Sequence, residues 1–373
     1  MKNVKKRKRV IVAMSGGVDS SVAALLLKKQ GYDVVGAFMH FWAEKSTFES
    51  VYHKIANKCC SLEAQEQARC VAQRLNIPFY VFDFSKEFKK TVVDYFLREY
   101  KRGFTPNPCV MCNKRIKFEF LLNKALSLDF DWLATGHYIR KIKYKKSRYK
   151  LFRAKDKQKD QSYFLYNLTQ EQLAHLLFPI GNYKKIHVRQ IAIKHNLPTA
   201  LRRESQGICF ILEKDQAAFL SRHLKKIKPG PILTLDGKKI GKHIGLPYYT
   251  IGQRKKIGIG LGGPYYVVDT DYKKNVLIVT DNPKHPRLFA NELWASDVNW
   301  IAGSIPKLPL RVKATIRYRH EAVSAEILQI RSQKYLIRFK IPQRAVTPGQ
   351  SIVFYKREEM LGGGVIEKPK IKH

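Results

Sequence analysis

The sequence predicts an α/β protein with an N-terminal doubly wound parallel sheet, a small central α+β domain and a C-terminal β-barrel. In the first half of the 373-residue chain, short apolar runs alternate with segments of helical apolar spacing, which is typical of parallel sheets. After about residue 210, glycine-rich turns separate short β-rich pieces, and from about Glu292 only strand-like runs remain. Evenly spaced short strands indicate a small barrel.

The elements of the N-terminal region are predicted in a strictly alternating order. A helix that ends at Gly31 has the C-cap residue that such helices favour. Ligands of this fold class bind at the carboxyl ends of the parallel strands. Strands are expected at residues 9–14, 33–39, 79–84 and 132–135, and helices at 21–30, 62–75, 88–100 and 116–126.

The C-terminal region contains no helical pattern. Its strand-like runs are residues 310–317, 322–328, 335–339 and 351–355. Together with the change at residue 210, these runs divide the chain into three predicted domains. The boundaries are 1–210 for the α/β domain, 211–288 for a central β-rich domain and 289–373 for the barrel.

Composition excludes several classes of protein. Hydrophobic residues make up 45% of the chain, which excludes a disordered basic tail. No apolar run approaches the ~18 residues that span a bilayer. The basic N-terminus MKNVKKRKRV resembles the start of a signal peptide, but the apolar run after it is too short for one. We therefore expect a soluble cytoplasmic protein, and the sequence gives no signal for its oligomeric state.

The charge balance predicts a polyanionic partner. Lys and Arg number 70 and Asp and Glu 30, a formal charge of +40. The excess is densest from Tyr138 to Gln161, where eleven Lys or Arg accompany Asp156 and Asp160, with aromatic residues between them. A solvated hairpin face would look similar, but interleaved cations and aromatics favour nucleic acid.

A glycine loop, Ser15-Gly16-Gly17-Val18-Asp19-Ser20, lies between the first predicted strand and the first helix. Glycines there let backbone N–H groups approach phosphate oxygens, and the helix adds its positive amino end. The Walker pattern is absent, and no Lys follows the glycines. The alternative is an ordinary tight turn that happens to be rich in glycine.

The cysteines suggest reactive thiols. Cys59, Cys60, Cys70, Cys109, Cys112 and Cys209 are too few for a disulfide scaffold in a chain of this length. Cys112 falls near the start of a helix, with Lys114 and Arg115 nearby, and such surroundings lower a thiol pKa. Three interpretations remain for Cys109, Cys112 and Cys209: a zinc site, buried inert cysteines, or sulfur or iron–sulfur chemistry. We favour the third, and expect Cys59, Cys60 and Cys70 to be structural.

The motif SGGxDS resembles the PP-loop of the ATP pyrophosphatases, whose fold is adenine nucleotide α-hydrolase-like. A longer ordered series of motifs resembles the tRNA-specific 2-thiouridylases. It comprises AMSGGVDSSVAALLL, GAFMHFW, ARCVAQRLNIPFYVFDF, TPNPCVMCNKRIKF, ATGHY, KDQSYFL, SQGICF, YYTIGQRKKIGIG and AVTPGQ, between residues 13 and 350.

The resemblance implies ATP- and Mg²⁺-dependent 2-thiolation of a tRNA wobble uridine. Cys209 would be the persulfide carrier, and Cys112 the nucleophile that releases hydrosulfide or closes a disulfide with Cys209. The resemblance also implies tRNA and a persulfide sulfur donor as partners. Asp19 would help to place Mg²⁺. Nucleotide-binding residues would be Ala13, Met14, Ser15, Gly16, Gly17, Val18, Asp19, Ser20, Met39 and Gly136. Residues contacting tRNA would be Asn107, Pro108, Cys109, His137, Lys159, Asp160, Gln161, Arg317, Tyr318 and Gln350.

One departure from the family leaves the mechanism open. Many members have Asp where this chain has Cys109, so a role of that Asp as general acid or base is in doubt here. Cys109, Cys112 and Cys209 could instead hold a [4Fe–4S] cluster, an alternative to the persulfide that the sequence does not decide. Another PP-loop ligase or a non-enzymatic RNA-binding protein with a zinc knuckle are the competing functions.

Overall fold

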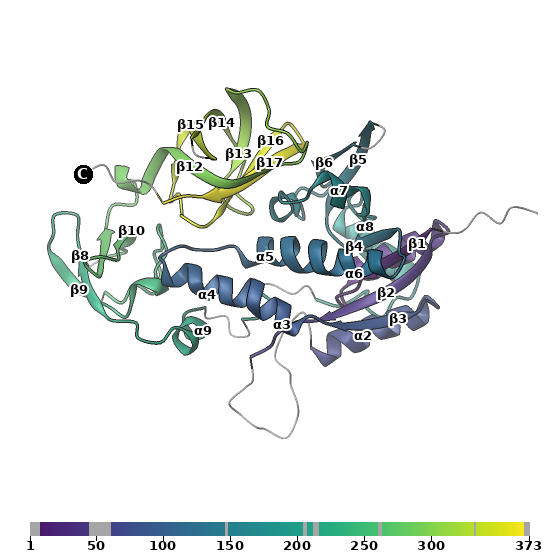
Figure 1. Ribbon diagram of the computed structural model, residues 1–373. Coiled ribbons are helices and arrows are strands. Elements are labelled where there is room, and N and C mark those ends of the chain that lie inside the picture. Colours follow the sequence, from purple (N-terminus) through teal and green to yellow (C-terminus); the bar gives the residue numbers. More distant parts are fainter. Residues whose placement is uncertain are drawn as a thin grey trace, which may run out of the picture.

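The structure is a computed structural model, and Figure 1 shows how its elements are arranged. It describes residues 8–44, 61–145, 148–203, 207–211, 216–259, 263–331 and 333–368. Cys59 and Cys60 lie outside the described residues, as do Ser205 and Gln206 of the SQGICF motif.

A five-stranded parallel sheet forms the centre of the N-terminal half, in the order β3-β2-β1-β4-β7. Alternate residues of β1 (Arg9–Ala13) enter two different cores: Ile11 packs in one buried cluster, and Val10 and Val12 pack in another. Both faces of the sheet are therefore covered, which confirms the doubly wound prediction. The other strands are β2 (Asp33–His40), β3 (Phe79–Asp83), β4 (Trp132–Thr135) and β7 (Leu176–Leu177).

Helices on the two faces come from different parts of the chain. One cluster takes residues from α1 (Val18–Lys29), α2 (Leu62–Arg74) and α8 (Lys185–Lys194). Figure 1 shows α2 on one side of the sheet, with α4 and α5 on the other. The second cluster draws on α3 (Ser85–Phe88), η1 (Lys89–Val93), α4 (Asp94–Lys101), α5 (Pro108–Met111), η2 (Cys112–Leu121), α6 (Leu122–Ser127), α7 (Gln170–Ala174) and α9 (Gln216–His223).

The helix predicted at 116–126 begins earlier than expected, at Pro108. Asn107 is its N-cap, and the Asn107 Oδ1 accepts a hydrogen bond from the Val110 amide at 3.3 Å. Proline suits the first helical position because its missing N–H would have no partner there. The helix then continues from α5 into the π-helical turns of η2, an uncommon conformation that is frequent at functional sites.

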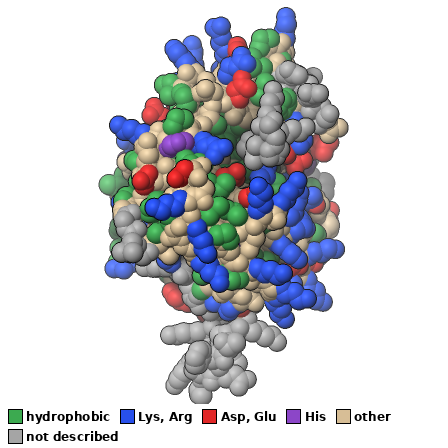
Figure 2. Space-filling view, turned by 90° about the vertical axis from the view of Figure 1, so that its left-hand side faces the viewer, with side chains coloured by type: hydrophobic (Ala, Val, Ile, Leu, Met, Phe, Trp, Pro, Cys, Tyr) green, Lys and Arg blue, Asp and Glu red, His purple; other side chains and the backbone are tan. Residues whose placement is uncertain are grey.

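The central region forms a small four-stranded sheet in the order β10-β11-β8-β9. Its own core contains Ile232, Val267 and Leu277, all fully buried. The strands are β8 (Gly230–Leu233), β9 (Lys239–His243), β10 (Tyr266–Asp271) and β11 (Val276–Thr280), with η4 (Leu246–Tyr248) between β9 and β10. Lys and Arg side chains cover much of the face that Figure 2 shows.

Six antiparallel strands close a β-barrel at the C-terminal end, in the order β12-β15-β14-β13-β16-β17, with β12 paired to β17. Closure removes exposed sheet edges and confirms the predicted barrel. Two of the strands, β12 and β17, were not predicted from the sequence. The strands are β12 (Phe289–Trp300), β13 (Leu310–Thr315), β14 (Val323–Arg331), β15 (Lys334–Arg344), β16 (Ser351–Lys356) and β17 (Glu359–Ile366), preceded by η5 (Pro286–Leu288).

A hairpin of β5 (Ile139–Lys145) and β6 (Arg148–Arg153) extends this barrel sheet. Strand β6 pairs with β17, so that Leu151 lies opposite Met360. The hairpin comes from the first predicted domain, and backbone pairing therefore crosses the boundary predicted at residue 210. The short helix η3 (Ser162–Phe164) follows it. Among the described residues, no helix is long and apolar enough to cross a membrane.

Candidate nucleotide and thiol site

The loop between β1 and α1 is a compact turn held by hydroxyl groups. Gly16 has φ +69°, and a Cβ there would collide with the backbone carbonyl oxygen of Ala64, so only glycine fits. The Ser20 hydroxyl donates to the Gly17 carbonyl at 3.1 Å and accepts from the Ser15 amide at 3.2 Å. The loop is thereby fixed at the amino end of α1, where the helix dipole favours an anion.

The segment after β4 lies directly against this loop. A Cβ on Gly136 would come within 2.7 Å of the Ser20 backbone nitrogen. Strand β1 lies between β2 and β4 in the sheet, and Met39 is the residue before the last of β2. The parallel strands therefore bring Ala13 to Ser20, Met39 and Gly136 to the same carboxyl edge, where ligands of this fold bind.

Asp19, in the first turn of α1, is part of a charged network. The Lys185 ammonium group lies 2.7 Å from each Asp19 carboxylate oxygen, and the Tyr138 hydroxyl donates to one of them at 2.7 Å. Lys185 is the first residue of α8 and is only 9% exposed. A buried ammonium needs an anionic partner, and in this conformation Asp19 supplies it.

A second cation reaches the same loop. An Arg202 guanidinium nitrogen donates to the Gly16 carbonyl at 2.7 Å, and another lies 3.4 Å from a Glu63 carboxylate oxygen. Sequence reasoning missed both Lys185 and Arg202, and noted only that no lysine follows the glycines. They are 166 and 186 residues from their partners in the loop, and no local motif marks them.

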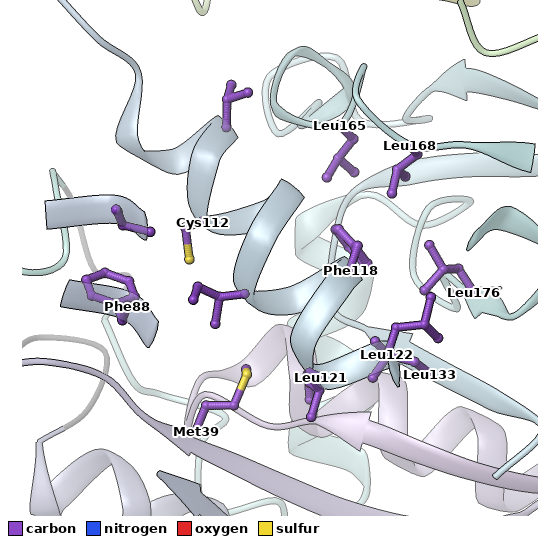
Figure 3. Packing of buried hydrophobic residues seen from close by; sticks show 14 of the residues in the cluster. Met39, Phe88, Cys112, Phe118, Leu121, Leu122, Leu133, Leu165, Leu168 and Leu176 are labelled. Carbon is purple, nitrogen blue, oxygen red and sulfur yellow. The ribbon is translucent and has the colours of Figure 1, made fainter. Parts of the chain in front are cut away.

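The cysteine motif lies at the start of the α5–η2 helix, which packs on the face of the sheet opposite to α1 and α2. Cys109 is exposed, whereas Cys112 is 8% exposed and belongs to the same buried cluster as Met39. Figure 3 shows the Cys112 side chain on the side of its helix that faces Phe88 and Met39. Cys112 therefore lies on the side of the α5–η2 helix that faces β2, the strand that ends beside the glycine loop.

Cys209 approaches the same cluster from a distant segment. Gly207 has φ +88°, a backbone conformation that favours glycine, and Cys209 is partly buried against the cluster that contains Cys112. The next residue, Phe210, anchors this segment, because its ring lies 5.8 Å from the Phe88 ring and 5.4 Å from the Phe96 ring. Tertiary packing thus brings both predicted sulfur-handling cysteines to one cluster.

The described residues do not provide a metal-binding set. No group of three or more His, Cys, Asp or Glu side chains among them is arranged to hold a metal ion. Cys109 is exposed, Cys112 is buried and Cys209 is partly buried. The [4Fe–4S] alternative stays a prediction from the sequence, and we derive no step through a cluster.

Two residues expected to contact tRNA are buried. His137 is 9% exposed, and its Nδ1 is hydrogen-bonded to the Thr135 hydroxyl at 2.7 Å. Burial, with a smaller contribution from Lys117, holds the pKa of His137 well below its usual value. Asp160 is 8% exposed and accepts a hydrogen bond from the Ser162 hydroxyl at 2.7 Å; burial raises its pKa. Both side chains have internal partners in this conformation.

The neighbouring Gln161 links the predicted tRNA segment to the glycine loop. Its side-chain oxygen accepts from the Tyr138 amide at 2.9 Å, and Tyr138 in turn binds Asp19. Lys159, two residues earlier, is half-buried. A ligand that displaces this segment would therefore also disturb the hydrogen bonds around Asp19.

The other residues predicted to contact tRNA lie in the C-terminal region that forms the barrel. Gln350 donates from its side-chain nitrogen to the Thr105 carbonyl at 2.9 Å, which holds the barrel against the TPNPC loop. The Tyr318 ring lies 4.4 Å from that of Phe164. Arg317 is half-buried and donates to the Ala345 carbonyl at 3.0 Å; burial lowers its pKa. The structure thus brings Asn107, Pro108 and Cys109 next to this end of the barrel.

Comparisons with known proteins cover all three regions. Residues 8–213 match the family described as tRNA methyl transferase HUP domain, 217–281 the tRNA methyl transferase PRC-barrel domain, and 290–366 the aminomethyltransferase beta-barrel domain. A tRNA-specific 2-thiouridylase MnmA from Carboxydothermus hydrogenoformans is 49% identical over 366 residues, covering 97% of this chain and 98% of the relative. The protein of the same name from Protochlamydia amoebophila is 45% identical, covering 98% and 95%. The chain belongs to the tRNA-specific 2-thiouridylase family.

Proposed function

We propose that this protein catalyses ATP-dependent 2-thiolation of the wobble uridine of tRNA. The observation that carries the proposal is the meeting, at one sheet edge, of the anion-binding loop with the cluster that holds Cys112 and Cys209. An enzyme that activates an oxygen with ATP and replaces it with sulfur needs these two chemistries side by side. The formal charge of +40 suits a polyanionic substrate.

The first step activates the uridine. The C2 oxygen attacks the α-phosphorus of ATP, the bond to the β-phosphate oxygen breaks, and pyrophosphate leaves. Backbone N–H groups at the start of α1, with Lys185 and Arg202 nearby, would stabilise the negative charge on the phosphates. Mg²⁺ binds through one or two carboxylates together with substrate phosphates, and Asp19 would be its protein ligand, supplying charge neutralisation for the departing pyrophosphate.

The second step delivers sulfur. The terminal sulfur of a Cys209 persulfide attacks C2, and AMP leaves with the former C2 oxygen. The Cys112 thiolate then attacks the Cys209 sulfur and breaks the sulfur–sulfur bond, so that the electron pair remains on the sulfur at C2. A Cys112–Cys209 disulfide results. An external dithiol reduces it, and a persulfide donor protein reloads Cys209.

Substrate binding would follow from the barrel and the segment around Gln161. Arg and Lys side chains position phosphates rather than read bases, and a target base must leave the anticodon stack to reach the thiols. Cys109 is exposed at the start of the α5–η2 helix, beside the half-buried Asn107 and the buried Pro108. The side chain of Cys109, where many relatives have Asp, would face the unstacked base.

The test is reconstitution with unmodified tRNA, ATP, Mg²⁺ and a cysteine-desulfurase persulfide donor. We expect 2-thiouridine by nucleoside mass spectrometry, with AMP and pyrophosphate formed in proportion. Cys112→Ser and Cys209→Ser should abolish thiolation and retain tRNA binding, and Asp19→Ala should weaken AMP formation. Cys70→Ser, at an exposed cysteine of α2, is the matched control and should be fully active.

Two results would contradict the proposal. Normal thiolation by either Cys112→Ser or Cys209→Ser would show that the sulfur site is elsewhere. AMP formation that does not depend on tRNA, without 2-thiouridine, would indicate a PP-loop ligase that acts on a small substrate.

A further inference from the structure

We infer that the outer face of the β5–β6 hairpin is a second contact surface for tRNA, outside the thiolation site. On this surface a nucleobase would stack on Tyr144 while neighbouring cations hold the phosphates. The inference rests on the proposed function, because tRNA is the substrate there. Figure 1 shows the hairpin projecting from the body of the molecule beside α7.

The two faces of the hairpin have different environments. On the inner face, Leu151 is fully buried opposite Lys141. The Lys141 ammonium group lies 4.4 Å from the Tyr149 ring centre and 5.0 Å from the Trp132 ring centre, and donates to the Leu173 carbonyl at 2.8 Å. This lysine is therefore used in packing.

Strand alternation places Ile142 on the opposite, outer face. Tyr144 lies at a register shift between Lys143 and Lys145, and its ring contact with Lys150, the partner of Ile142, places it on the same outer face. Ile142 lies opposite Lys150 in the register, and 48% of Ile142 and 57% of Tyr144 are exposed. We define the outer hairpin face as Arg140, Ile142, Tyr144, Lys145, Arg148, Lys150 and Phe152.

Cations surround the exposed ring of Tyr144. The ammonium groups of Lys150 and Lys145 lie 4.4 and 5.7 Å from its centre. The nearby acids already have partners: Glu359 lies 3.1 Å from Lys150, and Glu358 lies 3.9 Å from Lys157. The surface therefore combines an accessible π-face with excess positive charge, as in proteins that bind single-stranded nucleic acids. A protein-binding surface would instead favour aromatic residues and exclude lysine from its centre.

The hairpin is held in place at its base, so contacts on its outer face are made by a preformed surface. The Arg153 amide donates to the Glu358 carbonyl at 2.8 Å, and the Arg153 guanidinium lies 3.8 Å from the Tyr355 ring centre. Phe152 also lines a surface depression together with Lys356, Arg357, Glu358 and Glu359 at the β16–β17 turn, where the two acids are the ones paired with Lys157 and Lys150. Lys356 and Arg357 extend the basic surface from the hairpin onto the barrel.

The test compares tRNA dissociation constants of the full-length protein, measured by fluorescence anisotropy over a series of salt concentrations. Tyr144→Ala should weaken tRNA binding by about 5- to 150-fold, the effect of losing one stacked base, and Tyr144→Phe should bind normally. Lys145→Gln should remove one phosphate contact, and the slope of log K against log salt concentration should therefore become shallower by about 1. Tyr80→Ala, at an equally exposed tyrosine (56%) on β3, is the matched control.

The outcomes separate this inference from the proposed function. If the wild-type protein binds and thiolates tRNA but Tyr144→Ala and Lys145→Gln bind it with unchanged affinity and salt slope, the hairpin is not a tRNA contact. Loss of sulfur transfer from the donor protein by these variants, with normal tRNA binding, would make the face a protein-docking surface and overturn the inference. Absence of tRNA binding by the wild-type protein would instead refute the proposed function. Circular dichroism and thermal melting verify that the variants are folded.

Discussion

Replacing Lys185 with methionine removes the ammonium group beside the glycine loop while retaining most of the side-chain volume. We predict two separable effects. The folded state loses the counter-ion of Asp19, and the ATP site loses one of the two cations that reach the loop from distant segments. Lys185→Met should therefore lower both the free energy of unfolding and the affinity for MgATP.

The sizes of the two effects follow from the contacts. Hydrogen bonds to charged groups contribute about 1.5–3 kcal/mol. The Asp19 side chain is 30% exposed and also accepts from Tyr138, so water and this hydroxyl compensate in part. We therefore expect the free energy of unfolding to fall by about 1.5 kcal/mol, the lower end of that range. A lost phosphate contact of up to about 3 kcal/mol weakens binding by about 10- to 150-fold.

The measurements are urea unfolding and calorimetric titration with MgATP, in the absence of tRNA. Lys184→Met removes the same charge from an exposed neighbour and serves as the control. In the double variant Asp19→Asn with Lys185→Met, stability should recover because no carboxylate is left without its partner, whereas ATP affinity should stay low. If Lys185→Met binds MgATP with wild-type affinity, Lys185 acts only as the partner of Asp19 and our reasoning about the phosphates is wrong.

Three further predictions concern the loop, a buried histidine and the thiols. Gly16→Ala should lower the free energy of unfolding by at least about 1–3 kcal/mol. Gly31→Ala should cost less, because Gly31 has a similar positive φ but open space around it. The pKa of His137 is lowered in the folded state. Below pH 6.5 this histidine is therefore protonated in the unfolded chain but stays neutral in the folded protein. Stability should therefore fall as the pH decreases from 6.5, and less so in His137→Gln, as denaturant titrations would show. Protein purified anaerobically should contain no stoichiometric iron; about four irons per chain with acid-labile sulfide would contradict the persulfide mechanism.

Much of the fold follows from local patterns. Alternating apolar runs and helical spacing predicted β1, β2, β3 and β4 to within a residue. For β1, β2 and β4 the reason is that a parallel strand buried on both faces is apolar along its length, whereas β3 is a partly exposed edge strand. The helix that contains Cys112 was predicted to start later than it does. Proline at its first turn, which favours a helix start as well as a loop, hid the true beginning.

Surface exposure was harder to predict than secondary structure. The family resemblance placed His137 and Asp160 among the residues that contact tRNA, yet both are buried with internal hydrogen bonds. A polar residue in a loop is exposed or buried according to which distant segment packs over it, and the local sequence does not encode that segment. Cys109 and Cys112, three residues apart, differ in exposure for the same reason.

The sequence by itself determined the strand–glycine loop–helix unit, the two cysteine segments and four of the barrel strands, since each depends on residues that are close along the chain. The excess of positive charge follows from composition alone. Only the tertiary structure decided which cations reach the loop: Lys185 and Arg202 arrive from 166 and 186 residues away. It also joined the basic hairpin to the barrel through β6 and β17, and docked Gln350 on Thr105. Such contacts arise when separate elements bury their apolar faces together, and no periodicity within one element specifies its partner.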